Sequence, residues 1–293
     1  MLGEIRGEVR FKEPLSFHTS LRIGGSADIF IVPQDVEDIR LALSFAEREQ
    51  LSLDVIGGGN NLLVSDRGVR GVVLKLEGCL GRAEFNGEEA VAGAGVSLSA
   101  LIREAAALNL GGIECLVGVP ATVGGAVAMN AGTPDGGIAD FISAVYFLYP
   151  DGTLGEFKPG VGSYSYNVFT APARSVLIGA RLQLHRRPFA EIQKDIKQRL
   201  KQKKSTQPLA LASVGCVWKN PPGETATRLI EKVGLKGKRL NGAEISAKHA
   251  NFIVNRGGAA AADIKALMQL TLDRVRNHFG ITLEPEMKTM GEI

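Results

Sequence analysis

The chain has 293 residues, with 45% hydrophobic and 22% charged residues and a formal net charge of +3 at pH 7. This length suits two or three domains, and the charge is too small to indicate binding to nucleic acid or to a membrane surface. No apolar run approaches the ~18 residues of a membrane span, and the first residues carry no apolar signal core. We therefore expect a cytoplasmic protein without a membrane partner.

The first elements alternate between strand and helix. Ile29–Val32 and Leu53–Ile56 predict strands, and between them the apolar spacing from Asp35 to Gln50 predicts a helix with Asp35 as its N-cap. Val72–Leu76 predicts a further strand. This order is typical of an α/β unit.

A glycine-rich loop follows the second of these strands. It reads Gly57-Gly58-Gly59-Asn60-Asn61-Leu62. Exposed amide groups in such a turn form a concave site for an anion, usually a phosphate. The loop is neither a dinucleotide fingerprint, whose last glycine would fall at Leu62, nor a P-loop. The alternative is a glycine-rich hairpin without a ligand.

Residues 118–132 form a second stretch with a small residue at nearly every position. This composition suits close approach of the backbone to a flat or diphosphate-bearing ligand. It also suits tight helix packing, which is the alternative. Two such stretches in one chain favour a nucleotide-type cofactor.

The remaining elements suggest a second and a third domain. Asn86-Gly87 predicts a hairpin turn. The predicted strands are Ala83–Phe85, Glu89–Ala92, Val145–Tyr149, Leu154–Phe157, Val176–Leu184 and Ala250–Val254, and the predicted helices are Ser99–Leu108, Phe189–Lys204, Thr225–Val233 and Ala262–Phe279. In the helix from Phe189, we expect Ile192, Ile196 and Leu200 on one apolar side.

The chain has three cysteines and four histidines. Cys79, Cys115 and Cys216 are far apart and show no zinc-like spacing, and the histidines are scattered, so no metal is expected. Cys79 and Cys115 are expected to be buried apolar residues.

Several short motifs occur in a fixed order along the chain. They are Thr19-Ser20-Leu21-Arg22-Ile23-Gly24-Gly25, Gly57 to Asp66, Gly118 to Gly125, Asn130-Ala131-Gly132, Gly215 to Pro221, Leu229-Ile230-Glu231, Gly234-Leu235-Lys236-Gly237, Lys248 to Asn255 and Leu283-Glu284-Pro285-Glu286. These motifs and their order resemble the UDP-N-acetylenolpyruvoylglucosamine reductases, flavoenzymes of peptidoglycan precursor synthesis. The resemblance runs over nearly the whole chain.

The resemblance implies an α+β fold. Two subdomains, 1–76 and 77–187, would hold FAD between them, as in flavoproteins of the vanillyl-alcohol-oxidase type, and residues 188–293 would bind the UDP-sugar. The chain resembles the shorter branch of the family, without a tyrosine-bearing insertion. We expect a monomer with no nucleic-acid partner. The FAD is expected to be non-covalent, because neither glycine-rich stretch contains a histidine.

The resemblance also implies a reaction. NADPH reduces the flavin and leaves, and the enolpyruvyl ether of the UDP-sugar takes its place. Hydride passes from flavin N5 to the vinyl carbon, and a side chain protonates the neighbouring carbon. The developing carboxylate-enolate charge needs preorganised donors or cations, and one group must deliver a proton.

Residue roles are carried over by position. Cys216 stands where the family usually has its serine proton donor, and a thiol is chemically able to donate. Glu286 matches the catalytic carboxylate. The alternatives are a small buried side chain for Cys216 and a surface charge for Glu286.

The resemblance also implies binding residues for the cofactor and the substrate. The expected FAD-binding residues are Gly57, Gly58, Gly59, Asn60, Asn61, Leu62, Gly118, Pro120, Ala121, Thr122, Gly124, Gly125 and Asn130. The expected substrate-binding residues are Tyr164, Lys204, Lys219 and Asn220, with Lys203 beside Lys204 for the diphosphate.

One departure concerns the family's Tyr-Arg-x-Ser motif, whose arginine helps to stabilise the enolate. Here the segment reads Tyr164-Ser165-Tyr166-Asn167, which puts Ser165 or Asn167 at the arginine position. Ser165 is therefore expected as a third catalytic residue, beside Cys216 and Glu286. Neither residue is cationic, and a charge-assisted hydrogen bond is roughly twice as strong as a neutral one. Arg22 and Arg174 are candidate substitutes; otherwise activity is impaired. The rival hypotheses are a flavin oxidase of the same fold and a flavin-binding protein without catalysis.

Overall fold

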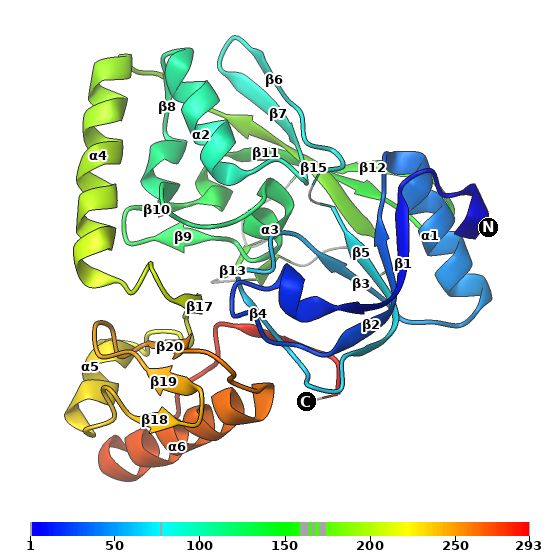
Figure 1. The fold of residues 1–293 in the computed structure, drawn as a ribbon. Coiled ribbons are helices and arrows are strands. Elements are labelled where there is room, and N and C mark those ends of the chain that lie inside the picture. Colours follow the sequence, from blue (N-terminus) through cyan, green and yellow to red (C-terminus); the bar gives the residue numbers. More distant parts are fainter. Residues whose placement is uncertain (1, 77, 159–163, 166–167, 170–173, 293) are drawn as a thin grey trace. The chain divides into compact units, whose positions relative to one another are not determined.

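The computed structural model describes residues 2–76, 78–158, 164–165, 168–169 and 174–292 (Figure 1). Its contacts divide the chain into two compact units. The first unit comprises Met1–Phe11, Ile29–Gly58 and Gly71–Gln202, and the second comprises Lys12–Asp28, Gly59–Arg70 and Lys203–Ile293. Residues 12–28 and 59–70 thus join the C-terminal third, and the predicted division into three consecutive segments stays a prediction.

The first unit begins with a sheet in the order β1-β2-β5-β3 and the helix α1. The bounds are β1 Glu8–Pro14, β2 Ser26–Val32, α1 Val36–Arg48, β3 Leu53–Ile56 and β5 Val69–Lys75. The chain order β2, α1, β3 matches the strand–helix–strand order predicted from the sequence, and β3 pairs in parallel with β5. The boundaries between the units fall inside β1, β2, β5 and the helix of residues 189–206, and between Gly58 and Gly59.

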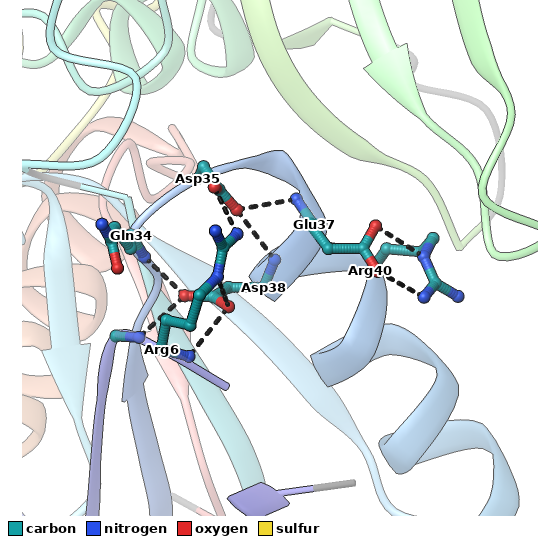
Figure 2. Close-up of polar contacts among 7 residues, drawn as sticks. Arg6, Gln34, Asp35, Glu37, Asp38 and Arg40 are labelled. Carbon is teal, nitrogen blue, oxygen red and sulfur yellow. Dashed lines mark hydrogen bonds and ion pairs between the residues drawn. The ribbon is translucent and has the colours of Figure 1, made fainter. Parts of the chain in front are cut away.

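Two aspartates fix the start of α1 (Figure 2). Asp35 caps the helix as predicted, because its carboxylate accepts hydrogen bonds from the amides of Glu37 and Asp38. Asp38 is fully buried and accepts from the amides of Arg6, Gly7 and Gln34. Burial opposes its ionisation, but these backbone donors and the Arg6 charge hold the pKa of Asp38 below its usual value.

The second sheet of this unit is antiparallel, in the order β12-β11-β15-β7-β6. Its strands are β6 Ala83–Asn86, β7 Glu89–Gly93, β11 Ile142–Leu148, β12 Leu154–Phe157 and β15 Val176–Gln183, and the helices packed into the same core are α2 Leu98–Ala107, α3 Val123–Ala128 and the first part of α4 Phe189–Thr206. The Asn86-Gly87 hairpin is confirmed, with Gly87 at φ +62°. In α4, Ile192 and Ile196 are buried, whereas Leu200 is exposed.

The second unit is built on a sheet in the order β17-β20-β19-β18, covered by two helices. The bounds are β17 Ala212–Cys216, α5 Ala226–Lys232, β18 Arg239–Leu240, β19 Ala243–Ile245, β20 Phe252–Asn255 and α6 Ala261–Phe279. A parallel pair, β4 Leu62–Val64 with β21 Lys288–Met290, belongs to the same unit. Trp218 is 1% exposed and is among the largest fully buried side chains.

Short elements complete the described chain: the strands β8 Leu110–Gly111, β9 Gly132–Thr133, β10 Gly136–Gly137, β13 Tyr164–Ser165, β14 Val168–Phe169 and β16 His185–Arg186, and the 3₁₀ helices Leu2–Glu4, Leu15–His18, Ile113–Leu116 and Ile138–Asp140. Among the described residues, no helix combines the length and hydrophobicity needed to cross a membrane. Nor do the described histidine, cysteine, aspartate and glutamate residues form a metal-binding group.

Candidate active site

The glycine-rich loop after β3 exposes a run of backbone donors. Within the described part of the chain, none of the amides of residues 57–61 donates a hydrogen bond. Gly59 has φ +63°, and a Cβ there would lie 1.9 Å from the carbonyl oxygen of His18, so only glycine fits. Consecutive amides without acceptors suit a phosphate or diphosphate, so the donor set of this loop fits the expected flavin dinucleotide.

The second glycine-rich stretch uses its amides differently. At the start of α3, Val123 N donates to Val96 O at 2.8 Å, Gly124 N donates to Ala94 O at 2.9 Å, and Gly125 N donates to Thr122 Oγ1 at 3.2 Å. These amides therefore have partners inside the protein. A Cβ on Gly124 would lie 2.8 Å from the Ala94 Cβ, which explains this glycine by packing. Contacts of this stretch with FAD remain a prediction.

The two stretches meet inside the first unit. A Cβ on Gly57 would lie 2.4 Å from the Thr122 Oγ1 atom, so the loop packs directly on the N-cap of α3. Two other predicted cofactor residues, Gly118 at φ +75° and Asn130 at φ +41°, adopt the left-handed conformation. Gly118 and Pro120 are exposed, whereas Thr122 is buried.

Cys216 and Glu286 lie on paired segments of the second unit. Cys216 ends β17, and the following residue, Val217, accepts a hydrogen bond at its carbonyl from Glu286 N at 2.8 Å. Next in line, Trp218 and Pro285 form an antiparallel bridge. Burial, and secondly the Glu286 charge, raise the pKa of the Cys216 thiol to about 12, while Lys203 acts in the opposite direction. At neutral pH, the thiol therefore keeps its proton.

The glycine-rich motif reaches this pair within the second unit. Asn61 Nδ2 donates to the carbonyl of Glu286 at 3.2 Å, and Lys288 N donates to the carbonyl of Asn61 at 3.0 Å. The pairing continues between Leu62 and Lys288 in the β4–β21 ladder. A residue predicted to bind the cofactor, Asn61, thus contacts the segment that carries the predicted catalytic carboxylate.

Two further residues of the quoted motifs have roles that the sequence did not reveal. Ser20 donates through Oγ to Ser213 O at 2.6 Å and through its amide to Gly59 O at 3.1 Å, which links the loop to β17. Asp66 accepts from the amides of Ala261 and Ala262 at 2.8 and 3.0 Å and so caps α6. Both residues stand in stretches singled out from the sequence, but only the fold shows their partners.

Comparison with known proteins identifies the family. The UDP-N-acetylenolpyruvoylglucosamine reductase of Anaeromyxobacter sp. (strain Fw109-5) is 42% identical over 98% of this chain and 90% of its own length. That of Moorella thermoacetica is 41% identical over 97% of this chain and 94% of its own length. This chain belongs to the UDP-N-acetylenolpyruvoylglucosamine reductase family.

Further matches agree with this family membership. Residues 207–290 match the profile of the UDP-N-acetylenolpyruvoylglucosamine reductase C-terminal domain, and residues 27–158 match that of an FAD binding domain. The crystal structure of the reductase from Thermus caldophilus superposes with a TM-score of 0.83 at 35% identity, covering 98% of this chain and 99% of that one. The predicted family, the α+β FAD-binding fold and the class of FAD-dependent oxidoreductase are confirmed.

The residues predicted for substrate binding have partners in the chain. Lys219 Nζ lies 3.3 Å from Glu284 Oε2, and Asn220 Oδ1 accepts from the amide of Ala226 at the start of α5, at 3.0 Å. Lys204 is exposed near the end of α4, and its carbonyl accepts from Lys248 Nζ at 2.5 Å. These contacts lie within the chain, and the contacts with substrate remain predictions.

The structure describes only part of the segment in which the family arginine is missing. Tyr164 and Ser165 form β13 in the first unit, and Asn167 lies outside the described residues. Of the two candidate cations, Arg22 is exposed and borders a hollow of about 230 Å³ in the second unit, together with Asn255 and Arg256. Arg174 is exposed in the first unit and lies 3.8 Å from Glu47.

The other two cysteines are buried, as predicted. Burial raises the pKa of Cys79 and of Cys115 to about 11. Both behave as small apolar residues, and neither is required by the site.

Proposed function

We propose that this chain reduces the enolpyruvyl group of UDP-N-acetylglucosamine enolpyruvate to UDP-N-acetylmuramate, using NADPH and FAD, as a step of peptidoglycan precursor synthesis. Membership of the family supports this activity. The structural observation that carries it is the pairing of the Cys216 and Glu286 segments beside Asn61 in the second unit. In the proposed site, a protonated thiol and a carboxylate would lie beside the loop that holds the cofactor.

The residues proposed to hold FAD are those of the two glycine-rich stretches. The amides of residues 57–61 are proposed to bind the diphosphate, because they have no acceptor among the described residues. Gly118, Pro120, Ala121 and Asn130 are proposed to approach the rest of the cofactor closely. FAD, once reduced by NADPH, would supply the hydride for the vinyl carbon.

Cys216 is proposed to supply the proton. When the vinyl carbon takes up hydride, the neighbouring carbon gains an electron pair, and the proton on Sγ moves to that carbon and leaves a thiolate. Burial and the Glu286 charge keep the thiol protonated until then. Water then returns the proton that the thiolate lacks. The charge of Lys203 reaches Cys216 and favours the thiolate.

Substrate binding is proposed for Tyr164, Lys204, Lys219 and Asn220. We propose that the enzyme acts as a monomer. We also propose that it works in the cytoplasm, where NADPH and nucleotide-linked sugars are available.

Steady-state oxidation of NADPH by the purified enzyme tests the activity. Turnover that depends on UDP-N-acetylglucosamine enolpyruvate is expected. Rapid oxidation by oxygen alone would instead favour a flavin oxidase, and a flavin that NADPH does not reduce would favour a binding protein. The second alternative is considered because the family arginine is replaced by Ser165 or Asn167.

Non-covalent binding of FAD gives a simple prediction. Neither glycine-rich stretch contains a histidine, and Cys79 and Cys115 are buried. Acid precipitation is therefore expected to release all of the yellow colour into the supernatant. Flavin retained on the denatured chain would contradict this.

Replacing Lys219 by alanine is expected to raise the KM for the UDP-sugar much more than that for NADPH. A lysine acts on a phosphate as a flexible point charge, and the exposed Glu284 partner leaves Lys219 able to turn toward a ligand. Initial rates at varied concentrations of each substrate measure both constants. If both constants rise equally, the role of Lys219 is structural.

A further inference from the structure

The segment that follows Cys216 lacks regular strand pairing. The ladder between β17 and β20 is irregular between Ser213 and Cys216, and Gly215 there has φ +84°. Beyond Cys216, the partner of the segment is the turn before β20. Val217 N donates to the carbonyl of Asn251 at 2.8 Å.

The side chain of Asn251 extends this pairing by one residue. Asn251 Oδ1 accepts from Trp218 N at 2.9 Å, and Asn251 Nδ2 donates to Trp218 O at 2.8 Å. A carboxamide offers the same donor and acceptor as a peptide group, so it satisfies both backbone groups of Trp218. Asn251 is 3% exposed and Trp218 is 1% exposed, so water does not replace these bonds.

The other edge of the same segment faces the Glu286 segment. Val217 O accepts from Glu286 N at 2.8 Å, and Lys219 N donates to Glu284 O at 2.9 Å. The Cys216–Lys219 segment is therefore held from both sides. Asn251 fixes one edge, and the residues around Glu286 fix the other.

We propose that Asn251 is a positioning residue, whose amide clamps the backbone of Trp218 and thereby holds the Cys216 thiol beside Glu286. This inference rests on the proposed function of Cys216 as the proton donor. Asn251 does not touch the reacting atoms. Its removal matters because a displacement of about 1 Å in a reacting group can cost about 10²-fold in rate.

The experiment uses the full-length, FAD-loaded enzyme and separates the two half-reactions by anaerobic stopped-flow absorbance. Asn251→Ala is expected to keep bleaching of the flavin by NADPH within about twofold of the unsubstituted enzyme. Its reoxidation by the UDP-sugar is expected to slow by about 10²-fold. Asn251→Asp keeps the size of the side chain and an acceptor for Trp218 N. Its rate of reoxidation is therefore expected to lie between those of Asn251→Ala and the unsubstituted enzyme. If Asn251→Ala does not fold, Asn251→Asp replaces it in the test.

The matched control is Asn255→Ala. Asn255 lies in β20 and also makes three side-chain hydrogen bonds, accepting from the amides of Gly257 and Ala259 and donating to Leu21 O. It has no contact with the Cys216–Lys219 segment among the described residues. This variant is expected to lower the melting temperature as Asn251→Ala does, but to keep the rate of reoxidation.

A second readout is independent of catalysis. Alkylation of Cys216 by iodoacetamide, mapped by mass spectrometry, is expected to be slow in the unsubstituted enzyme and in Asn255→Ala, and at least about tenfold faster in Asn251→Ala, because a loosened segment exposes the thiol. Alkylation of Cys216 at the unsubstituted rate in Asn251→Ala would overturn the inference. So would equal losses in both half-reactions, or equal slowing of reoxidation in the two alanine variants.

The two readouts separate this inference from the proposed function. If the UDP-sugar does not reoxidise the unsubstituted enzyme, the proposed function fails, and the alkylation rates alone decide whether Asn251 positions Cys216.

Discussion

Replacing Cys216 by alanine is expected to leave the flavin reducible by NADPH and to slow its reoxidation by the UDP-sugar by about 10²–10⁴-fold. The two half-reactions differ because only the second places a proton on carbon. In the native enzyme, burial and Glu286 raise the pKa of this thiol to about 12, so its proton is present throughout the neutral range. Rapid mixing under anaerobic conditions, with flavin absorbance as the signal, measures each half-reaction separately.

Cys216→Ser is the control for this prediction. A serine hydroxyl is close in size to the thiol and can also donate a proton, so the serine variant is expected to retain much of the reoxidation step. The raised pKa adds a pH test. An ordinary thiol with the reference value of 9.0 would lose its proton as the pH rises through 9, whereas a thiol with a pKa of about 12 keeps it. Reoxidation is therefore expected to show no loss from Cys216 ionisation between pH 7 and about pH 10. Reoxidation of Cys216→Ala at the native rate would show that the thiol is only a packing group.

Glu286→Gln is expected to slow the same half-reaction by about 10²-fold or more, again without loss of flavin reduction by NADPH. Glu286 N is tied to Val217 O and its carbonyl is tied to Asn61, so the backbone holds this residue in place whichever side chain it carries. The substitution removes a negative charge from the surroundings of Cys216, so the pKa of the thiol is expected to fall. Rapid mixing gives the rate, and the pH dependence of Cys216 alkylation gives the direction of the pKa change.

The control for Glu286→Gln is Glu231→Gln. Glu231 is a carboxylate of the same unit and forms a surface ion pair with Lys236 at 2.6 Å. Exposed pairs of this kind contribute little to stability, about 0–1 kcal/mol. This variant is expected to keep both half-reactions. If Glu286→Gln also keeps the rates of both half-reactions, Glu286 has no part in the chemistry.

The sequence predicted those features that local interactions determine. Asp35 caps α1 because an aspartate before an amphipathic run can accept from the first helical amides. The Asn86-Gly87 turn forms because both residues tolerate the backbone of a tight hairpin. The family and its cofactor could be predicted because many short motifs occur in one order along the chain.

Features that depend on distant residues could not be predicted. Gly57 and Gly124 look alike in sequence, but the amides after Thr122 are used inside the protein, whereas those of residues 57–61 have no acceptor among the described residues. The end of α4 is another case, because Leu200 continues the helical spacing but is exposed. The closeness of Cys216 to Glu286 arises from the bridge between Trp218 and Pro285, which no local pattern reveals.

A single anaerobic turnover is the sharpest test of the proposed activity. The enzyme is reduced with one equivalent of NADPH, mixed with UDP-N-acetylglucosamine enolpyruvate in the absence of oxygen, and the sugar is analysed by mass spectrometry. We expect the flavin to regain its oxidised spectrum and about one equivalent of UDP-sugar to gain two hydrogens. A flavin that stays reduced until air is admitted, with the sugar unchanged, would contradict this expectation.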